Sequence, residues 1–409
     1  MTSTKAQGDT VALLRNGAFC RLWLTSGSSF AALSAYLLFE QWYVVRELQH
    51  PSALGIVMAA TVISRLMLMS VGGVMVDRLG GSRVATWSAM SRFFVVLAMI
   101  ACLNANVLTL GALLVFGVLY GACDAFFTPS INSLAPRLVP DEQLRSANAA
   151  LQTASQGGMI LGPLVGAALL TVSFAAVLLA VAGLLALAVL SVLWLRDPRQ
   201  THEEQASGFW SELTSGWRQL KHVEGAWENL GIIVAVNFLF FGPLLMGVPI
   251  LIAEDASARP SQLGILQGAY AAGMIGGAAA AALVGERPWL IRALLPALGL
   301  GLVGVGMATH PWQIALMAAM GVASSVINVL IITCIQRAAS PEITGRVMAV
   351  VSITSTGTVP VSYAVLGALL GSGLSIAPLI VTAGGLVFVI GAVFLVAGTL
   401  SRTRGAADA

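Results

Sequence analysis

Three charged side chains lie inside long apolar stretches of this sequence, namely Glu40, Arg65 and Asp124. A charge at membrane depth costs at least about 2.5 kcal/mol, so each of these groups calls for a partner or a task. A carboxyl group in such a place can carry a proton, hold a cation or pair with a base. For Glu40 we expect proton uptake and release or contact with a cationic ligand. The alternative is an interfacial carboxylate that pairs with Arg46 or with water.

Asp124 has three bases as candidate partners, Arg65, Arg78 and Arg83. We expect Asp124 to lie near the end of the fourth apolar stretch and to form a structural or gating salt bridge with one of them. The alternative is an Asp124 that itself carries protons. Each reading requires helices that bring distant parts of the chain together inside an apolar layer.

The composition indicates that the apolar layer is lipid. Of the 409 residues, 57% are hydrophobic and 10% are charged, whereas soluble chains carry about 25% charged residues. A helix that crosses the hydrocarbon core needs about 20 apolar residues. Runs of that length predict an all-α membrane protein with twelve spans. They are 22–45, 52–76, 84–103, 107–130, 146–171, 173–195, 229–252, 261–284, 290–308, 312–335, 346–370 and 376–399.

The basic residues predict the orientation of these spans. If the N-terminus is cytoplasmic, Arg46 and Arg259 fall outside and Arg65 lies within a span, whereas the other 18 of the 21 Lys and Arg residues fall on the cytoplasmic side, as the positive-inside rule requires. The 18 are Lys5, Arg15, Arg21, Arg78, Arg83, Arg92, Arg137, Arg145, Arg196, Arg199, Arg218, Lys221, Arg287, Arg292, Arg337, Arg346, Arg402 and Arg404. Both termini are therefore expected to be cytoplasmic.

The longest polar segment, 196–228, divides the chain into two bundles of six helices, 1–195 and 229–409. Within it Trp210 and Trp217 recur with leucines at helical spacing, which predicts a short amphipathic helix. We expect this cytoplasmic linker helix to pack its apolar side against a bundle; a regulatory role is the alternative.

Several motifs resemble one family of membrane proteins. Gly73, Asp77, Arg78 and Gly80, followed by the base Arg83, match the loop between helices 2 and 3 of the major facilitator superfamily. Three further stretches are similar to the macrolide-efflux and enterobactin-exporter branch, which consists of drug:proton antiporters. They are Asn16–Trp23, Asp124–Ser130 followed by Leu134–Pro140, and Gly158-x-x-x-Gly162-Pro163-x-x-Gly166.

The resemblance implies two pseudo-symmetric six-helix bundles that alternate access to a central cavity. It places Asp77 against the N-terminal end of helix 11, where the helix dipole favours a carboxylate. It implies that the bend at Pro163 helps to seal the cavity, while packing alone is the alternative. The chain departs from the family in two ways: Gly81 and Ser82 precede Arg83, and helix 4 lacks the arginine that many proton antiporters carry.

The resemblance also implies a cavity lined by aromatic and neutral polar side chains. Such a lining suits a bulky amphiphile better than a small anion, which needs paired bases. The alternative is that these hydroxyl and amide groups only join helix to helix. The expected lining is Trp42, Gln156, Asn237, Phe238, Phe241, Ser325, Asn328, Ser355 and Tyr363.

These features predict a secondary active exporter of an amphiphilic small molecule, drug-like or siderophore-like, driven by proton antiport in the bacterial cytoplasmic (inner) membrane. The alternatives are a lipid or lysolipid flippase of the same fold, an uptake transporter, and a membrane receptor or regulatory subunit that does not transport. No phosphate-binding loop occurs in the sequence. We expect no enzymatic activity, no cofactor, no metal and no nucleic-acid partner, and we expect a monomer.

Overall fold

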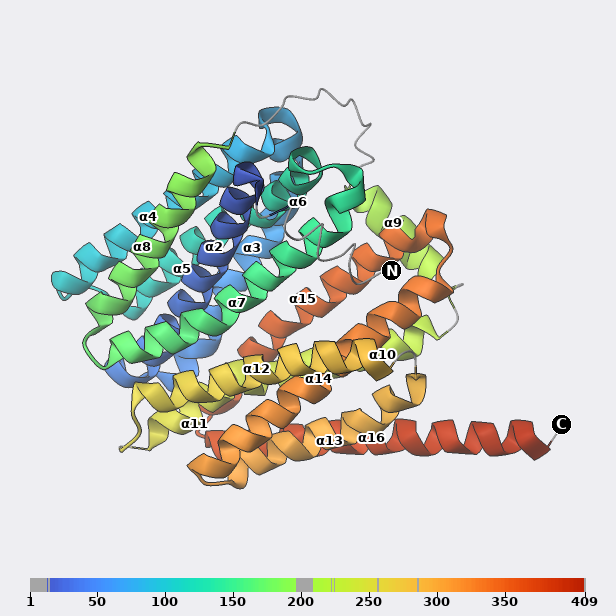
Figure 1. Ribbon diagram of the computed structural model, residues 1–409. Helices are drawn as coiled ribbons and strands as arrows, with labels where there is room; N and C mark the ends of the chain where they lie inside the picture. Colours follow the sequence, from blue (N-terminus) through green and yellow to red (C-terminus); the bar gives the residue numbers. More distant parts are fainter. Residues whose placement is uncertain are drawn as a thin grey trace. The chain divides into compact units, whose positions relative to one another are not determined.

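The computed structural model describes residue 13 and residues 15–195, 209–221, 223, 225–255, 257–284 and 287–407. Every regular element in this described part is helical (Figure 1). The first elements are α2 (Gly17–Trp42), the π-helix η1 (Tyr43–Glu47), α3 (Pro51–Leu79), α4 (Gly81–Asn104), α5 (Leu110–Asp124), α6 (Phe127–Leu138), the 3₁₀-helix η2 (Asp141–Gln143), α7 (Leu144–Leu170) and α8 (Phe174–Leu193).

The remaining elements begin with the linker helix. They are α9 (Phe209–Leu220), α10 (Ala226–Val236), the π-helices η3 (Asn237–Phe241) and η4 (Pro243–Gly247), α11 (Val248–Glu254), α12 (Pro260–Val284), α13 (Pro288–Met307), α14 (His310–Ala338), α15 (Pro341–Gly371) and α16 (Ile376–Ala407).

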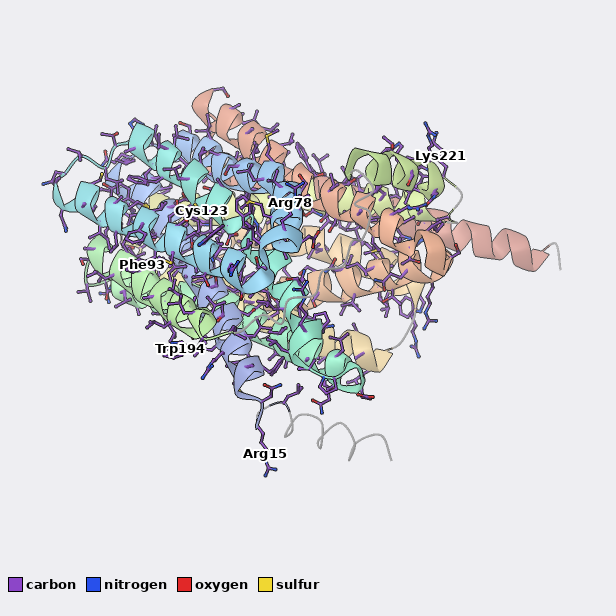
Figure 2. All side chains as sticks on the ribbon, turned by 90° about the horizontal axis from the view of Figure 1, so that it is seen from above. Arg15, Arg78, Phe93, Cys123, Trp194 and Lys221 are labelled. Atoms are coloured by element: carbon purple, nitrogen blue, oxygen red, sulfur yellow. The ribbon has the colours of Figure 1, made fainter. Side chains whose placement is uncertain are left out.

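Twelve helical stretches in the described residues are long and apolar enough to cross a membrane, as the sequence predicted. Large apolar side chains on them stay exposed, including Met67 at 75% and Leu283 at 88%. Trp194, labelled in Figure 2 near the end of α8, is 71% exposed. Exposed apolar surface of this extent is expected for helices whose solvent is lipid.

The fourth span is longer than the sequence suggested. It runs to Leu138, not to residue 130, because α6 continues it after a short break at Ala125 and Phe126. The buried residues of α6 recur at helical spacing and join a cluster with Phe19 and Leu22 of α2. The side chain of Asn16 ties the two elements together. It caps α2 by accepting from two backbone N–H groups and donates to the Leu138 carbonyl.

The seventh span is not a continuous α-helix. Two π-helical segments, η3 and η4, interrupt it on either side of Gly242. Pro243 has no backbone N–H, so the Leu239 carbonyl lacks the hydrogen-bond donor that a regular α-helix would provide. The backbone hydrogen bonds on either side of Gly242 follow the wider spacing of a π-helix instead. A side chain at Gly242 would overlap Ser362 of α15, whose hydroxyl donates to the Phe238 carbonyl.

The helices form two compact units by their contacts. One unit contains residues 1–49, 56–204 and 259–264, and the other contains 50–55, 205–258 and 265–409. In the first, α2 packs along α7 and α8, and α4 packs along α8. In the second, α13 packs along α16 and α14 (Figure 1).

The linker helix α9 packs against α15. Gly216 lies against the backbone of Arg346, where a Cβ atom would collide with the Arg346 carbonyl. Trp217 stays 43% exposed and makes an edge-to-face contact with Trp227. Residues 196–208 of the expected linker lie outside the described residues.

Candidate functional site

Three charged side chains meet in the interior of the first unit. Asp124 Oδ1 accepts from Arg92 Nη1 at 2.6 Å, and Asp124 Oδ2 lies 3.3 Å from Arg65 Nε. Asp124 and Arg92 are buried, while the Arg65 side chain is 31% exposed. Arg78 and Arg83, the other bases considered for Asp124, are exposed and form no ion pair with it.

Each member of this Arg65–Arg92–Asp124 cluster lies at the midpoint of its helix. Arg65 is fourteen residues from either end of α3, and Arg92 lies eleven and twelve residues from the ends of α4. Asp124 is fourteen residues from either end of the fourth span, not near its end as the sequence suggested. The three residues therefore lie at the middle of helical stretches that are apolar enough to cross a membrane, where unpaired charge is costly.

Arg92 was misplaced by sequence reasoning, which counted it among the cytoplasmic bases. It is fully buried, and its guanidinium donates to Asp124, to Ser29 Oγ of α2 at 2.8 Å and to the Ser88 carbonyl at 3.3 Å. Its guanidinium also lies over the Phe127 ring at 4.8 Å. The signal was present, because Arg92 lies inside the predicted span 84–103. A basic side chain does contact Asp124 in the fourth span, but it is that of Arg92, which belongs to α4, the third span.

Glu40 lies in a different, uncharged environment of the same unit. It is fully buried, and its hydrogen-bond contacts among the described residues are with hydroxyl groups and not with Arg46. Tyr36 Oη donates to Glu40 Oε1 at 2.5 Å, and Thr61 Oγ1 of α3 lies 3.4 Å from the same oxygen. Glu40 Oε2 has no hydrogen-bond partner among the described residues. Gly117 of α5 leaves the room for this arrangement, since a Cβ atom there would lie 3.3 Å from Oε1.

Two tyrosines connect Glu40 with the charge cluster. The ring of Tyr36, which donates to Glu40, stacks on the ring of Tyr120 with centroids 4.1 Å apart and planes 6° apart. Tyr120 in turn lies below the Arg92 guanidinium at 5.9 Å. A continuous line of contacts thus runs from Glu40 through two rings to Arg92 and Asp124.

The three glycines of the helix 5 motif pack against α2. A Cβ atom at Gly158 would collide with the Gly27 carbonyl, one at Gly162 with Ser34 and the Ala31 carbonyl, and one at Gly166 would touch Leu38 at 3.0 Å. Pro163 is buried within α7, which continues through it to Leu170. The motif therefore joins helix 5 closely to helix 1.

The loop motif after α3 is largely exposed. Gly80 has φ +90°, a conformation that glycine adopts without strain, and it begins the turn into α4. Asp77, Arg78 and Arg83 are exposed (Arg78 is labelled in Figure 2). The motif resembles one whose glycines let two helices approach closely, but nothing described lies within 4 Å of a Cβ atom built at Gly73, whereas Gly72 lies against the backbone at Ala125.

The predicted cavity residues differ in exposure. In the first unit, Trp42 is buried beneath the Arg46 guanidinium at 5.3 Å, and Gln156 is half-buried. In the second unit the seven residues divide into three groups. Ser325 and Tyr363 are buried, Asn328 is exposed, and Asn237, Phe238, Phe241 and Ser355 are half-buried. Asn237, Phe238 and Phe241 all lie in η3, and π-helical turns are frequent at functional sites.

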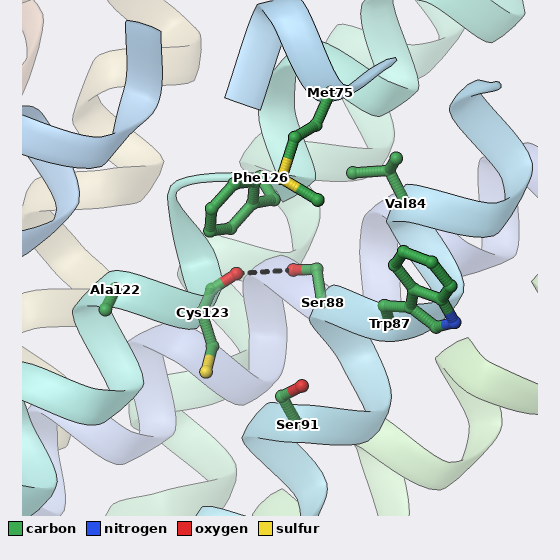
Figure 3. Close-up of a pocket in the computed structure, with 8 residues that line it drawn as sticks. All are labelled: Met75, Val84, Trp87, Ser88, Ser91, Ala122, Cys123 and Phe126. Atoms are coloured by element: carbon green, nitrogen blue, oxygen red, sulfur yellow. Dashed lines mark hydrogen bonds between the residues drawn. The ribbon is translucent and has the colours of Figure 1, made fainter. Parts of the chain in front are cut away.

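Two cavities lie within the first unit. The smaller, of about 170 Å³, lies between α3, α4 and α5 beside Cys123, whose carbonyl accepts from Ser88 (Figure 3). The larger, of about 440 Å³, lies between α2, α6 and α7. Its lining is Ser26, Phe30, Phe127, Thr128, Ile131, Asn132, Pro136, Leu144, Asn148, Leu151, Gln152 and Ser155. Pockets for drug-sized ligands measure about 300–1,000 Å³, so the larger of these two cavities has sufficient room.

The family model of the Major Facilitator Superfamily matches residues 22–362, which is most of the chain. The chain belongs to the Major Facilitator Superfamily. Membership, together with the twelve apolar helices, makes it a multi-pass membrane transporter and not an enzyme. The family fold that the sequence motifs predicted is thereby confirmed.

One curated relative is macrolide efflux protein A of Enterococcus faecalis. The two chains are 25% identical over 246 residues, which cover 58% of this chain and 76% of the relative. This similarity is consistent with the drug-efflux branch of the superfamily.

Solved structures of superfamily transporters share the fold. The D323A mutant of the nucleoside transporter NupG matches with a TM-score of 0.76 at 14% identity, covering 93% of this chain and 99% of NupG. A POT family transporter in complex with a thioalcohol-conjugated peptide matches with a TM-score of 0.70 at 13% identity, covering 92% and 95%. A bacterial homologue of the human lysosomal transporter Spinster gives 0.68 at 15% identity, covering 93% and 94%.

Proposed function

We propose that this transporter exports an amphiphilic small molecule, drug-like or siderophore-like, across the cytoplasmic membrane in exchange for protons. The observation that carries the proposal is Glu40, a fully buried carboxyl group with no cation beside it and with one oxygen unpartnered among the described residues. An ionised carboxylate in that place would cost several kcal/mol, and binding a proton removes the cost. The macrolide-efflux relative supports the direction of transport.

The coupling follows from the line of contacts around Glu40. Binding or release of its proton changes the hydrogen bond to Tyr36, whose ring stacks on Tyr120 beneath Arg92. Arg92 and its partner Asp124 join α2, α4 and α5, so a change at Glu40 reaches α2, which is one of the helices that enclose the larger cavity. We propose that this coupling biases alternating access between two states of the transporter.

Replacement of Glu40 by Gln tests the proposal. The variant keeps the size and the acceptor for Tyr36 but cannot exchange a proton, so we expect substrate binding to persist and export driven by a pH gradient to fall at least tenfold. The measurement is export of a fluorescent amphiphile from energised cells and its exchange without a gradient in proteoliposomes. Unchanged gradient-driven export would remove Glu40 from the mechanism.

A further inference from the structure

The buried charge cluster carries one more positive than negative charge. Arg65 and Arg92 both contact the single carboxylate of Asp124, and no other acidic side chain among the described residues contacts either guanidinium. Excess charge at mid-depth is costly. A site of this kind is stabilised by whatever brings a matching negative charge to it.

Arg65 is the member of the cluster whose N–H donors are not all engaged by the described residues. The guanidinium of Arg92 is fully buried and is engaged through Nε, Nη1 and Nη2. Arg65 is 31% exposed, faces Asp124 through Nε and makes only a long hydrogen bond of 3.4 Å from Nη2 to Thr128 Oγ1. A guanidinium has five N–H donors in a planar fork that matches an oxyanion.

Thr128 connects Arg65 with the larger cavity, because it forms part of the wall between α2, α6 and α7. The neighbouring wall residue Phe127 lies beneath Arg92 and makes an edge contact with Phe30 at 6.1 Å, so Arg92 lies behind an aromatic part of the wall. Neither arginine is among the residues that line the cavity, and Arg65 reaches the lining through its hydrogen bond to Thr128.

We propose that this cavity binds an amphiphile that carries one negatively charged group, with the anion on Arg65 and Thr128 and the apolar body against Phe30 and Phe127. This inference rests on the proposed export function and specifies the substrate class of the same transporter. It also changes the expectation from the sequence, which disfavoured a small anion because it found no paired bases near the cavity. Here one base, Arg65, and one hydroxyl group, that of Thr128, would hold the anion.

The test compares two probes that differ in one charged group. Anilinonaphthalene sulfonate carries a sulfonate, and phenylnaphthylamine is the same aromatic amine without it. Binding of each to the purified full-length chain in lipid nanodiscs is measured by calorimetry, with empty nanodiscs as the blank. For Arg65→Gln we expect affinity for the sulfonate to fall about tenfold or more, because a charge-assisted bond is lost, and affinity for the neutral amine to change less than twofold.

Three further variants control the experiment. Arg65→Lys keeps the charge and should recover part of the sulfonate affinity. Thr128→Val removes the neighbouring hydroxyl and should weaken sulfonate binding about threefold. Arg21→Gln changes an exposed arginine of α2 that is not part of the cavity lining and should leave both affinities unchanged. The pair of Asp124 with Arg92 persists in each variant, and unaltered melting temperatures verify the fold.

The outcomes separate the two proposals. The anion site is wrong if the wild-type chain does not bind the sulfonate above the blank, or if Arg65→Gln affects both probes equally or neither. Gradient-driven transport of the same probes is measured in proteoliposomes. If the sulfonate binds through Arg65 but neither probe is transported, the result supports the anion site and contradicts the proposed export function.

Discussion

At the scale of single residues, the site is a set of buried polar groups on helices that are otherwise apolar. Asp124 holds two arginines, and Glu40 holds none. This contrast separates their expected roles, because removing the charge of Asp124 would leave buried arginine without a counter-charge, whereas Glu40 has no cation beside it that depends on its charge. We therefore propose a structural role for Asp124 and proton exchange for Glu40.

The first residue-scale prediction concerns stability. Asp124→Asn leaves the fully buried Arg92 without its counter-charge, so we expect a loss of about 3–5 kcal/mol in the free energy of unfolding. The measurement is unfolding of the purified chain by denaturing detergent. The control is Asp77→Asn, whose parent side chain is exposed and should change stability by less than about 0.5 kcal/mol. Equal effects of the two substitutions would contradict the role of the buried pair.

At the scale of elements, the contact between α2 and α7 depends on a line of glycines. Gly158 and Gly162 leave no room for a methyl group against the α2 backbone. Neighbouring Gly157 has nothing within 4 Å of a Cβ built on it. The two adjacent glycines therefore differ in their packing, in agreement with the motif in the sequence, which includes Gly158 and not Gly157.

This difference predicts opposite effects of one substitution. Gly158→Ala should cost about 1–3 kcal/mol, because the added methyl group forces the helices apart. Gly157→Ala should be neutral or stabilising by up to about 1 kcal/mol, since alanine favours a helix over glycine. Melting temperatures of the two variants in the same detergent give the comparison, and a destabilised Gly157→Ala would show that the packing assigned to this helix face is wrong.

At the scale of the whole molecule, transport requires the protein to change the side from which its site is accessible. The resemblance to the family places Asp77 in a contact that forms only when the cytoplasmic side is closed. We therefore predict that Asp77→Asn slows transport several-fold while substrate affinity changes little, because the carboxylate biases the equilibrium between states without touching the substrate. Turnover and binding measured on one preparation test this. Undiminished turnover would remove Asp77 from the conformational cycle.

The twelve spans also predict topology. An even number of crossings places residues before the first span and after the last on one side, and the distribution of basic residues places that side in the cytoplasm. In a variant with the four native cysteines replaced by alanine, Arg15→Cys and Arg402→Cys should react with a membrane-impermeant maleimide only after the cells are opened. Labelling of either position in intact cells would contradict the proposed orientation.

The sequence by itself determined the membrane location, the number of spans and the family. A chain in lipid needs long apolar helices whose backbone groups are hydrogen-bonded internally, and runs of about 20 apolar residues can be recognised directly in the sequence. It also marked Glu40, Arg65 and Asp124 as charges that need an explanation. Only the tertiary structure decided their partners. Arg92 is one base among many in the sequence, and it becomes part of the site because α4 packs so that its midpoint faces Asp124. Span counting measures distance along a helix, whereas pairing depends on which face each helix turns toward its neighbours.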